Sequence, residues 1–301
     1  MLLVTGITGH SGRYFLQELI DNKYEETIKC IVRETSDTSM LDNSGLMIEK
    51  VVGNLDNKEF VDKTMKSVDT VMHIYNIHHS PMIVQAAIKN KVKRVILVHT
   101  TGIYSKFKNA SHEYRKIEKK IIDIAKKSSC ETKITILRPT MIYGDLCDHN
   151  ISKFIRMVDK LPIIPVIDKG SSLLQPVNAR DLGKAYFTML KLPVKNGELK
   201  AYDLSGDKPI KMIDILNLIS RELNKKAVYI SIPMGLGIFI SKIFKWLSLG
   251  KFDVTEKVQR MGEDRSYSHE DASNDFGYNP MLFEDGIRIE VEQYKSKQFK
   301  I

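Results

Sequence analysis

The sequence predicts an α/β protein in which a doubly wound parallel sheet is followed by a smaller C-terminal α/β region. The first 145 residues alternate short apolar runs with amphipathic segments, which is the pattern of successive βαβ units. A glycine-rich turn separates the first apolar run from the first amphipathic segment. The alternation ends after Gly144. With 301 residues, the chain is long enough for one large α/β domain and a smaller one.

Six apolar runs are expected to form the parallel strands, and they cover residues 2–5, 28–33, 47–53, 70–74, 94–99 and 135–138. Helical periodicity is clearest in residues 12–22 and 114–128. Past Gly144 we expect a helix over residues 151–161, a strand over 173–177 that returns to the sheet, and a covering helix over 180–190. A helix over 212–223 and a strand over 227–232 follow. We therefore predict a first domain of residues 1–145, to which residues 173–205 return, and a second region of residues 146–172 and 206–301.

Composition and charge limit the classes of partner. Hydrophobic residues make up 43% of the chain and charged residues 28%, as in ordinary globular proteins. The net charge of +9 suits nucleic acid, anionic lipid or an anionic small molecule. The lysines are dispersed and lack the interleaved aromatic residues of a nucleic-acid surface. We expect a phosphate-bearing small molecule and no nucleic acid.

Cysteine spacing and hydropathy indicate a cytoplasmic protein. The three cysteines fit no metal-binding pattern and are expected to be reduced. A strand begins at residue 2, which leaves no room for a signal peptide. The apolar stretch of residues 228–249 is interrupted by Pro233, Lys242 and Lys245, so we expect no membrane-spanning helix. This stretch fits either a helix of the second region, a homodimer contact, or a peripheral contact with a membrane surface.

The glycine-rich turn carries the strongest functional signal. Gly6, Gly9 and Gly12 have the spacing G-x-x-G-x-x-G, directly after a strand and before a helix. In a Rossmann domain these glycines permit the turn, the approach of a pyrophosphate to the backbone, and close packing of helix on strand. The pyrophosphate then lies at the helix N-terminus, beside Thr8, His10 and Ser11. We therefore expect this Rossmann domain to bind a dinucleotide.

The end of the second strand bears on the choice between NADP and NAD. An acidic residue normally stands there to bind the ribose hydroxyls of NAD, but this chain has Arg33. A guanidinium matches a 2′-phosphate, so NADP is the preferred cofactor, with Arg13 as a second contact. Glu34 follows at once and could serve NAD, which stays open as the alternative.

Several separated segments resemble the extended or atypical short-chain dehydrogenase/reductase superfamily, in particular its NAD-dependent epimerase/dehydratase members that handle nucleotide sugars. The segments are residues 53–56, 69–74, 136–144, 175–182, and 275–280 together with 284–287. The resemblance implies that the second region binds substrate. It implies cofactor contacts from Asn54, Leu55, Ile74, Tyr75, Asn76, Pro139, Thr140 and Met141, and substrate contacts from Gln175, Arg180, Arg260 and Arg265.

The superfamily's catalytic residues are a Ser or Thr and a Tyr-x-x-x-Lys pair, in which the lysine lowers the pKa of the tyrosine. The resemblance places Thr100 in the Ser/Thr position and makes Tyr114 the candidate tyrosine. Tyr114 is followed at the fourth position by Glu118 rather than lysine. Either Tyr114 still acts, with Lys116, Lys119 or another cation beside it, or the pair is gone and the domain binds its cofactor without this chemistry.

These observations imply an NAD(P)-dependent oxidoreductase or epimerase/dehydratase-like protein that acts on a nucleotide-linked sugar or a similar small hydroxyl or carbonyl substrate. The alternative is a non-catalytic NAD(P)-binding protein with a redox-sensing, regulatory or assembly role. His73, His78 and His79 gather at the end of the fourth strand, but no carboxylate or thiol stands at ligand spacing, so we expect a polar loop there and no metal.

Overall fold

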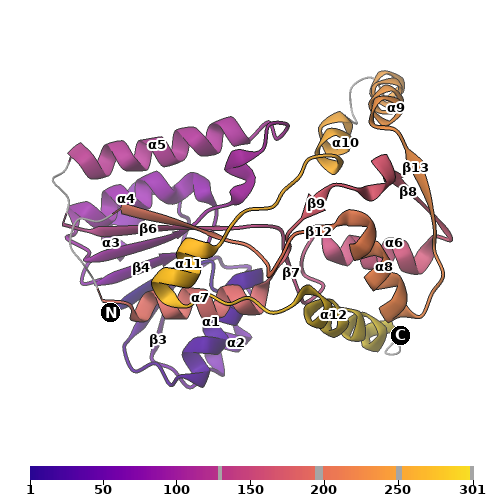
Figure 1. The fold of residues 1–301 in the computed structure, drawn as a ribbon. Coiled ribbons are helices and arrows are strands. Elements are labelled where there is room, and N and C mark those ends of the chain that lie inside the picture. The colour runs from indigo at the N-terminus through magenta and orange to yellow at the C-terminus, as the bar shows by residue number, and fades with distance from the viewer. Residues whose placement is uncertain (128–130, 194–198, 249–252, 299–301) are drawn as a thin grey trace.

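The computed structural model describes residues 1–127, 131–193, 199–248 and 253–298. Its centre is a seven-stranded sheet in the order β11-β6-β5-β4-β1-β2-β3, and every neighbouring pair is parallel (Figure 1). The strands are β1 (Leu2–Thr5), β2 (Ile28–Val32), β3 (Ile48–Val52), β4 (Thr70–His73), β5 (Arg94–Val98), β6 (Lys133–Pro139) and β11 (Leu199–Leu204). The predicted doubly wound parallel sheet is confirmed.

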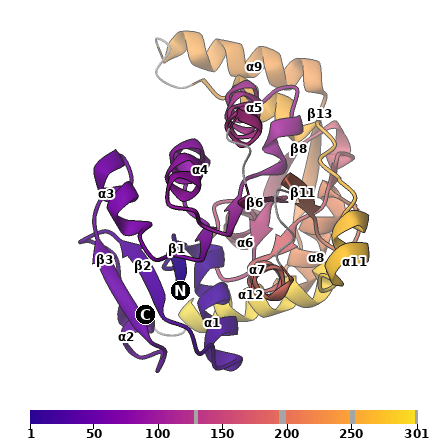
Figure 2. The same cartoon turned by 90° about the vertical axis from the view of Figure 1, so that its left-hand side faces the viewer.

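Helices cover both faces of the sheet, because alternate side chains of each strand point to opposite faces. Leu2 and Val4 of β1 belong to one core, and Leu3 belongs to the other. The first core lies under α1 (His10–Asp21) and α7 (Ala179–Lys191), which pack on each other, and α2 (Ser39–Asp42) lies near it. The second core lies under α3 (Lys58–Thr64), α4 (Ser80–Lys89) and α5 (Ser111–Lys127), and Figure 2 shows these three helices on one side of the sheet. The short helices η1 (Ile77–His79) and η2 (Thr101–Tyr104) follow β4 and β5.

The strand expected at residues 173–177 does not join the sheet, and this prediction is wrong. Its two halves are β9 (Leu173–Leu174), which pairs antiparallel with β12 (Ile210–Lys211), and β10 (Val177–Asn178), which pairs with β7 (Ile142–Tyr143). Pro176 stands between the halves and has no N–H for a continuous ladder. The seventh strand of the sheet is β11, which pairs with β6.

A third core holds the second region together. It lies among α6 (Ile151–Lys160), α8 (Met212–Leu223) and α12 (Phe283–Gln298), with the parallel pair β8 (Ile163–Ile167) and β13 (Val228–Ile232). The remaining elements there are η3 (Asp168–Gly170), α9 (Met234–Leu247) and α10 (Thr255–Met261). The helix α11 (Glu270–Phe276) departs from the predicted division, because it packs on β11 and contributes Ala272 to the first core. The C-terminal segment therefore crosses back to the sheet before α12.

Candidate functional site

A cavity of about 710 Å³ opens at the carboxyl ends of the strands, where ligands bind in this type of sheet. It lies around the turn after β1 and extends across the ends of β2, β3 and β4. Its lining residues are Thr5, Gly6, Thr8, Gly9, His10, Ser11, Ile31, Val32, Arg33, Glu34, Thr35, Ser36, Val52, Gly53, Asn54, Leu55, Ile74, Tyr75 and Ile142. We call it the first cavity.

The three glycines of the turn have different roles. Gly6 has a φ of +77°, and a Cβ atom there would lie 2.8 Å from the backbone nitrogen of Tyr75. A Cβ atom on Gly12 would lie 2.1 Å from the carbonyl oxygen of Gly6, so Gly12 allows α1 to pack against the turn. At Gly9 a Cβ atom would meet only that same oxygen, at 3.1 Å. Gly9 therefore leaves space toward the cavity rather than toward the protein.

The N-terminus of α1 is suited to an anion. Gly9 stands at its N-cap, so no side chain caps the helix, and the first turn holds no acidic residue. The first N–H groups of a helix have no partner inside the helix, and the helix dipole favours negative charge there. The residues present therefore fit a dinucleotide whose pyrophosphate lies at this helix end.

The wall of the first cavity at the end of β2 contains both residues that bear on cofactor choice. Arg33 and Glu34 are exposed and line the cavity. The backbone N–H of Arg33 donates to Ser36 Oγ at 3.1 Å, and the N–H of Ser36 donates back to the Arg33 carbonyl at 3.0 Å. Arg13 does not join them, because its Nη2 donates to Asp145 Oδ2 at 2.8 Å. Arg13 is therefore paired within the protein and does not line the first cavity, contrary to the expectation that it contacts the 2′-phosphate.

The cofactor residues implied by resemblance are divided between several places. Asn54, Leu55, Ile74 and Tyr75 line the first cavity. Thr140 and Met141 line a second cavity. Asn76 and Pro139 are among the lining residues of neither cavity. The side chain of Asn76 accepts from the N–H of His78, and the Pro139 carbonyl accepts from the hydroxyl of Thr101.

The second cavity, of about 450 Å³, adjoins the first, because His10 and Ile142 line both. It lies between the end of β5 and the second region. Its lining residues are His10, Thr100, Thr101, Gly102, Ser105, Lys108, Thr140, Met141, Ile142, Cys147, Asp148, His149, Asn150, Leu174, Gln175, Arg260, Arg265 and Tyr267. Thr100 thus lies on the wall of the second cavity.

Tyr114 does not lie on the wall of either cavity. Burial raises its pKa, and the charge of Glu113 raises it further, which is opposite to the shift that a tyrosine base requires. Lys116 and Lys119 are exposed on α5, and neither lowers the pKa of Tyr114. The ammonium of Lys108 covers the face of the Tyr114 ring, 4.6 Å from its centroid. Tyr114 therefore lacks both the position at a cavity and the lowered pKa that an acid/base tyrosine needs.

Three cations gather in the second cavity: Lys108, Arg260 and Arg265. Burial lowers the pKa of Lys108, and the charges of Arg260 and Arg265 lower it further. Burial, together with the charge of Arg260, lowers the pKa of Arg265 to about 10. The Nε atoms of Arg260 and Arg265 are buried without a hydrogen-bond partner in the described part of the chain. The carboxylate of Glu256 raises the pKa of Lys108, and that of Glu263 raises the pKa of Arg265, but the two Nε atoms without a partner would suit an anionic ligand.

Two other residues expected to contact substrate have partners within the protein. Gln175 lines the second cavity, but its Nε2 donates to the Gly206 carbonyl at 2.8 Å and its Oε1 accepts from the Tyr267 N–H at 3.0 Å. Arg180 lines neither cavity. Its Nη1 donates to the Gly144 carbonyl at 2.6 Å, and its guanidinium lies 4.9 Å from the centroid of the Tyr14 ring. We correct the substrate role expected for Arg180, because these contacts make it a structural residue.

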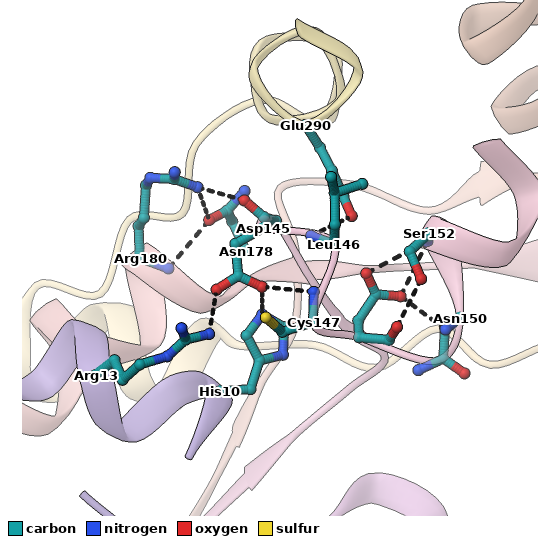
Figure 3. A network of polar contacts seen from close by, with 12 residues as sticks. His10, Arg13, Asp145, Leu146, Cys147, Asn150, Ser152, Asn178, Arg180 and Glu290 are labelled. Carbon is teal, nitrogen blue, oxygen red and sulfur yellow. Dashed lines mark hydrogen bonds and ion pairs between the residues drawn. The ribbon is translucent and has the colours of Figure 1, made fainter. Parts of the chain in front are cut away.

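A polar network joins the glycine turn to the segment after β7 (Figure 3). Asp145 accepts from the N–H of Cys147 at 3.0 Å and pairs with Arg13, and its Oδ1 lies 2.7 Å from His10 Nε2. Burial alone would raise the pKa of Asp145, but the hydrogen bond and charge of His10, with the other donors, lower it. This network holds His10 where the two cavities meet.

The sequence interpretation missed several of these residues, namely Lys108, Asp145 and Tyr267. The position of Asp145 directly after the segment 136–144 was a signal that could have been used. No comparable signal marks Lys108, which follows η2 in a loop.

The histidines at the end of β4 have partners within the protein. His73 is buried and bonds to Thr5 Oγ1 at 2.7 Å and to the Asn76 carbonyl at 3.2 Å. His78 lies 3.3 Å from a carboxylate oxygen of Glu113, and His79 lies 2.9 Å from Asp56. Within the described ranges, no group of three or more His, Cys, Asp or Glu side chains could hold a metal ion.

Comparison with known proteins shows which family the chain matches. Residues 1–267 match the NmrA-like family. A 2-alkyl-3-oxoalkanoate reductase from Shewanella oneidensis is 22% identical over 330 aligned positions, which cover 95% of this chain and 84% of that protein.

Two solved structures share the fold over nearly their whole length. MoeE5 in complex with UDP-glucose and NAD has a TM-score of 0.74 at 14% identity, and 99% of each chain is covered. A triphenylmethane reductase of Citrobacter sp. in complex with NADP(H) has a TM-score of 0.72 at 18% identity, with 96% of this chain and 100% of that chain covered. These likenesses confirm the fold. Because the family match extends over most of its length, the chain belongs to the NmrA-like family.

Proposed function

We propose that this protein is an NAD(P)-dependent oxidoreductase that acts on a carbonyl or hydroxyl group of an anionic small molecule, such as a nucleotide-linked sugar. The observation that carries the proposal is the junction of the two cavities at His10 and Ile142. One cavity has the features of a dinucleotide site, and the other is lined by polar and cationic side chains. A cofactor that extends through the junction would present its reactive ring to the second cavity.

The first cavity would hold the cofactor through residues that fit it. The turn from Gly6 to Ser11 and the free N–H groups of α1 would bind the pyrophosphate. Arg33, with Thr35 and Ser36 beside it, would bind a 2′-phosphate, which favours NADP over NAD. The NADP(H) complex of the triphenylmethane reductase supports this choice, while the NAD complex of MoeE5 keeps NAD as the alternative. The bound cofactor would supply or accept the hydride.

The second cavity would orient and protonate the substrate. Arg260 and Arg265 would bind its anionic group, and the diphosphate of a nucleotide-linked sugar is such a group. Lys108 Nζ lies 2.8 Å, and Thr100 Oγ1 3.2 Å, from the point where Gly102 would carry a Cβ atom, so the two groups face the same small space. In reduction, the Lys108 ammonium would donate its proton to the carbonyl oxygen and then regain one from water. Because its pKa is lowered, Lys108 gives up its proton more readily near neutral pH than an ordinary lysine does.

A non-catalytic cofactor-binding regulator is the second candidate. One observation favours it: the superfamily's tyrosine and lysine pair is not reproduced at Tyr114 and Glu118. The side chain of Glu118 instead forms a buried ion pair with Arg138, at 2.6 Å, and contacts His99 at 3.0 Å. These groups would stabilise the end of β5 without handling a substrate proton.

Oxidation of NADPH with a panel of keto sugars linked to nucleotides and small anionic ketones tests the proposal. Lys108→Met should lower kcat by about two to four orders of magnitude, and Lys108→Arg should also lose kcat while retaining KM, because arginine keeps the charge but holds its proton. Tyr114→Phe and Lys116→Met, on the same stretch of chain, are the matched controls and should stay within a few-fold of the native rate. Activity should fall as the pH rises through the lowered pKa of Lys108, since the protonated form acts.

Tight NADPH binding by the native protein without turnover of any substrate would favour the regulator. Turnover that survives Lys108→Met would show that another group donates the proton.

A further inference from the structure

The helix α9 presents its apolar side away from the protein. Seven of its large apolar side chains are between 42% and 76% exposed, whereas an ordinary surface helix turns such residues inward. They are Leu236, Phe239, Ile240, Ile243, Phe244, Trp246 and Leu247. At 100° per residue they occupy one continuous arc of roughly 160° around the helix. In both views α9 lies at the periphery of the molecule (Figures 1 and 2).

Small residues attach the other side of α9 to the protein. Only Gly237 and Ser241 of this helix are buried. A Cβ atom on Gly237 would lie 2.9 Å from the Ile167 side chain of β8 and 3.2 Å from the Val258 side chain of α10. The hydroxyl of Ser241 lies 3.2 Å from that of Thr255. The helix thus packs on the protein through its small residues, and its large apolar side chains are exposed to solvent.

The sequence around α9 is strongly basic. Residues 225–260 contain seven lysines and arginines but two acidic residues, so this segment carries more than half of the chain's net charge of +9. Lys242 is exposed and lies beside the apolar arc on the helix. Lys245 lies on the opposite side of the helix, where it pairs with Asp253 at 2.7 Å. An apolar helix face bordered by Lys242, within a basic segment, is complementary to a surface with apolar depth and negative charge.

We propose that α9 docks on the surface of an anionic lipid bilayer, with its apolar arc at the boundary of headgroups and acyl chains and Lys242 at the lipid phosphates. A second copy of the chain would fit less well, because two copies that each carry +9 and the same basic segment repel one another. Trp246 is the only tryptophan of the chain and is 76% exposed, and tryptophan favours the membrane interface.

The helix would lie along the bilayer rather than cross it. It has 14 residues, whereas a spanning helix needs about 20. No helix in the described ranges is long and apolar enough to cross a membrane. The proposal is independent of the proposed function, since no residue of α9 lines either cavity.

Flotation with vesicles tests this docking, without cofactor or substrate present. The full chain is mixed with vesicles of phosphatidylcholine alone, or of phosphatidylcholine and phosphatidylglycerol in a ratio of about 7 to 3. We expect binding to the anionic vesicles only, weakened by salt, with a blue shift of Trp246 emission. The double variant Phe239→Ser/Ile243→Ser should bind at least tenfold more weakly, and Lys242→Glu should bind several-fold more weakly. Because these side chains are exposed, the variants should fold normally by circular dichroism.

Leu282→Ser is the matched control, because Leu282 is 55% exposed and lies outside α9. It should bind as the native chain does. Absence of binding to anionic vesicles, equal binding to neutral vesicles, or binding unaffected by the α9 variants would each overturn the proposal. So would a native dimer that the double variant converts to a monomer while neither protein binds vesicles, since a second copy would then cover α9.

Discussion

At the scale of single residues, the exposed guanidinium of Arg33 at the end of β2 carries the proposed preference for NADP. It lines the first cavity with Ser36, and its side chain would meet a 2′-phosphate. Arg33→Ala should weaken NADP binding by about 1.5–3 kcal/mol, the value of a charge-assisted hydrogen bond, and leave NAD binding nearly unchanged. Calorimetry with both dinucleotides measures the ratio of affinities.

Arg13→Ala serves as the control for Arg33, because its guanidinium is paired with Asp145. It should leave the ratio of NADP to NAD affinity close to the native value. Equal affinities of the native protein for the two dinucleotides would contradict the preference and favour Glu34 as the ribose contact.

At the scale of elements, the turn between β1 and α1 contains one glycine that matters for ligand binding and one that matters for folding. Gly9→Val should leave the fold intact, because its side chain points toward the cavity and meets only the Gly6 carbonyl within the protein. It should nevertheless abolish dinucleotide binding by occupying the place of the pyrophosphate. Gly12→Val should instead destabilise the protein by more than about 3 kcal/mol, because its Cβ atom would clash with that carbonyl.

Thermal unfolding and calorimetry with NADPH distinguish the two glycine variants. A folded Gly9→Val protein with native affinity for NADPH would refute the dinucleotide site. A Gly12→Val protein as stable as the native one would show that α1 can move away from the turn.

At the scale of the whole molecule, Glu290 joins the C-terminal helix α12 to the segment after β7. It is fully buried, and its Oε1 accepts from the Leu146 N–H at 3.1 Å. Burial raises its pKa, and the neighbouring carboxyl of Asp148 raises it further. The folded protein therefore keeps this proton to higher pH than the unfolded chain does. Stability should fall as the pH rises from the ordinary glutamate range, about 4.3, toward the raised pKa.

Glu290→Gln should remove this pH dependence, because the amide cannot ionise, can still accept from Leu146, and can donate to Asp148. We expect a higher Tm than that of the native protein at pH 8 and a similar Tm near pH 4.5. Glu292→Gln, an exposed position on the same helix, should change neither value appreciably. If the native loss of stability with rising pH persists in Glu290→Gln, another buried group is responsible.

The local sequence was sufficient to predict the first six strands of the sheet and the turn at Gly6, Gly9 and Gly12. Apolar runs and glycine spacing are properties of neighbouring residues, and the carboxyl ends of parallel strands meet at one edge whatever the rest of the fold. The strand-end position selected Arg33, and the resemblance to short-chain dehydrogenases/reductases selected Asn54 and Tyr75. Each of these residues lines the first cavity.

Only the tertiary structure decided what surrounds the second cavity and which residues hold the regions together. Lys108 meets Arg260 and Arg265 there although more than 150 positions separate them, and their mutual effect on pKa depends on distance and burial rather than on sequence spacing. Arg180 lies in a family motif and was predicted to bind substrate, but it donates to the Gly144 carbonyl. Residues 173–177 were predicted to form one strand, but they form two strands that are separated at Pro176. In each case the partner comes from a distant segment. The sequence by itself therefore determined the sheet and the dinucleotide turn, while folding determined the charge of the second cavity and the position of Lys108 in it, because those depend on contacts between residues far apart in the chain.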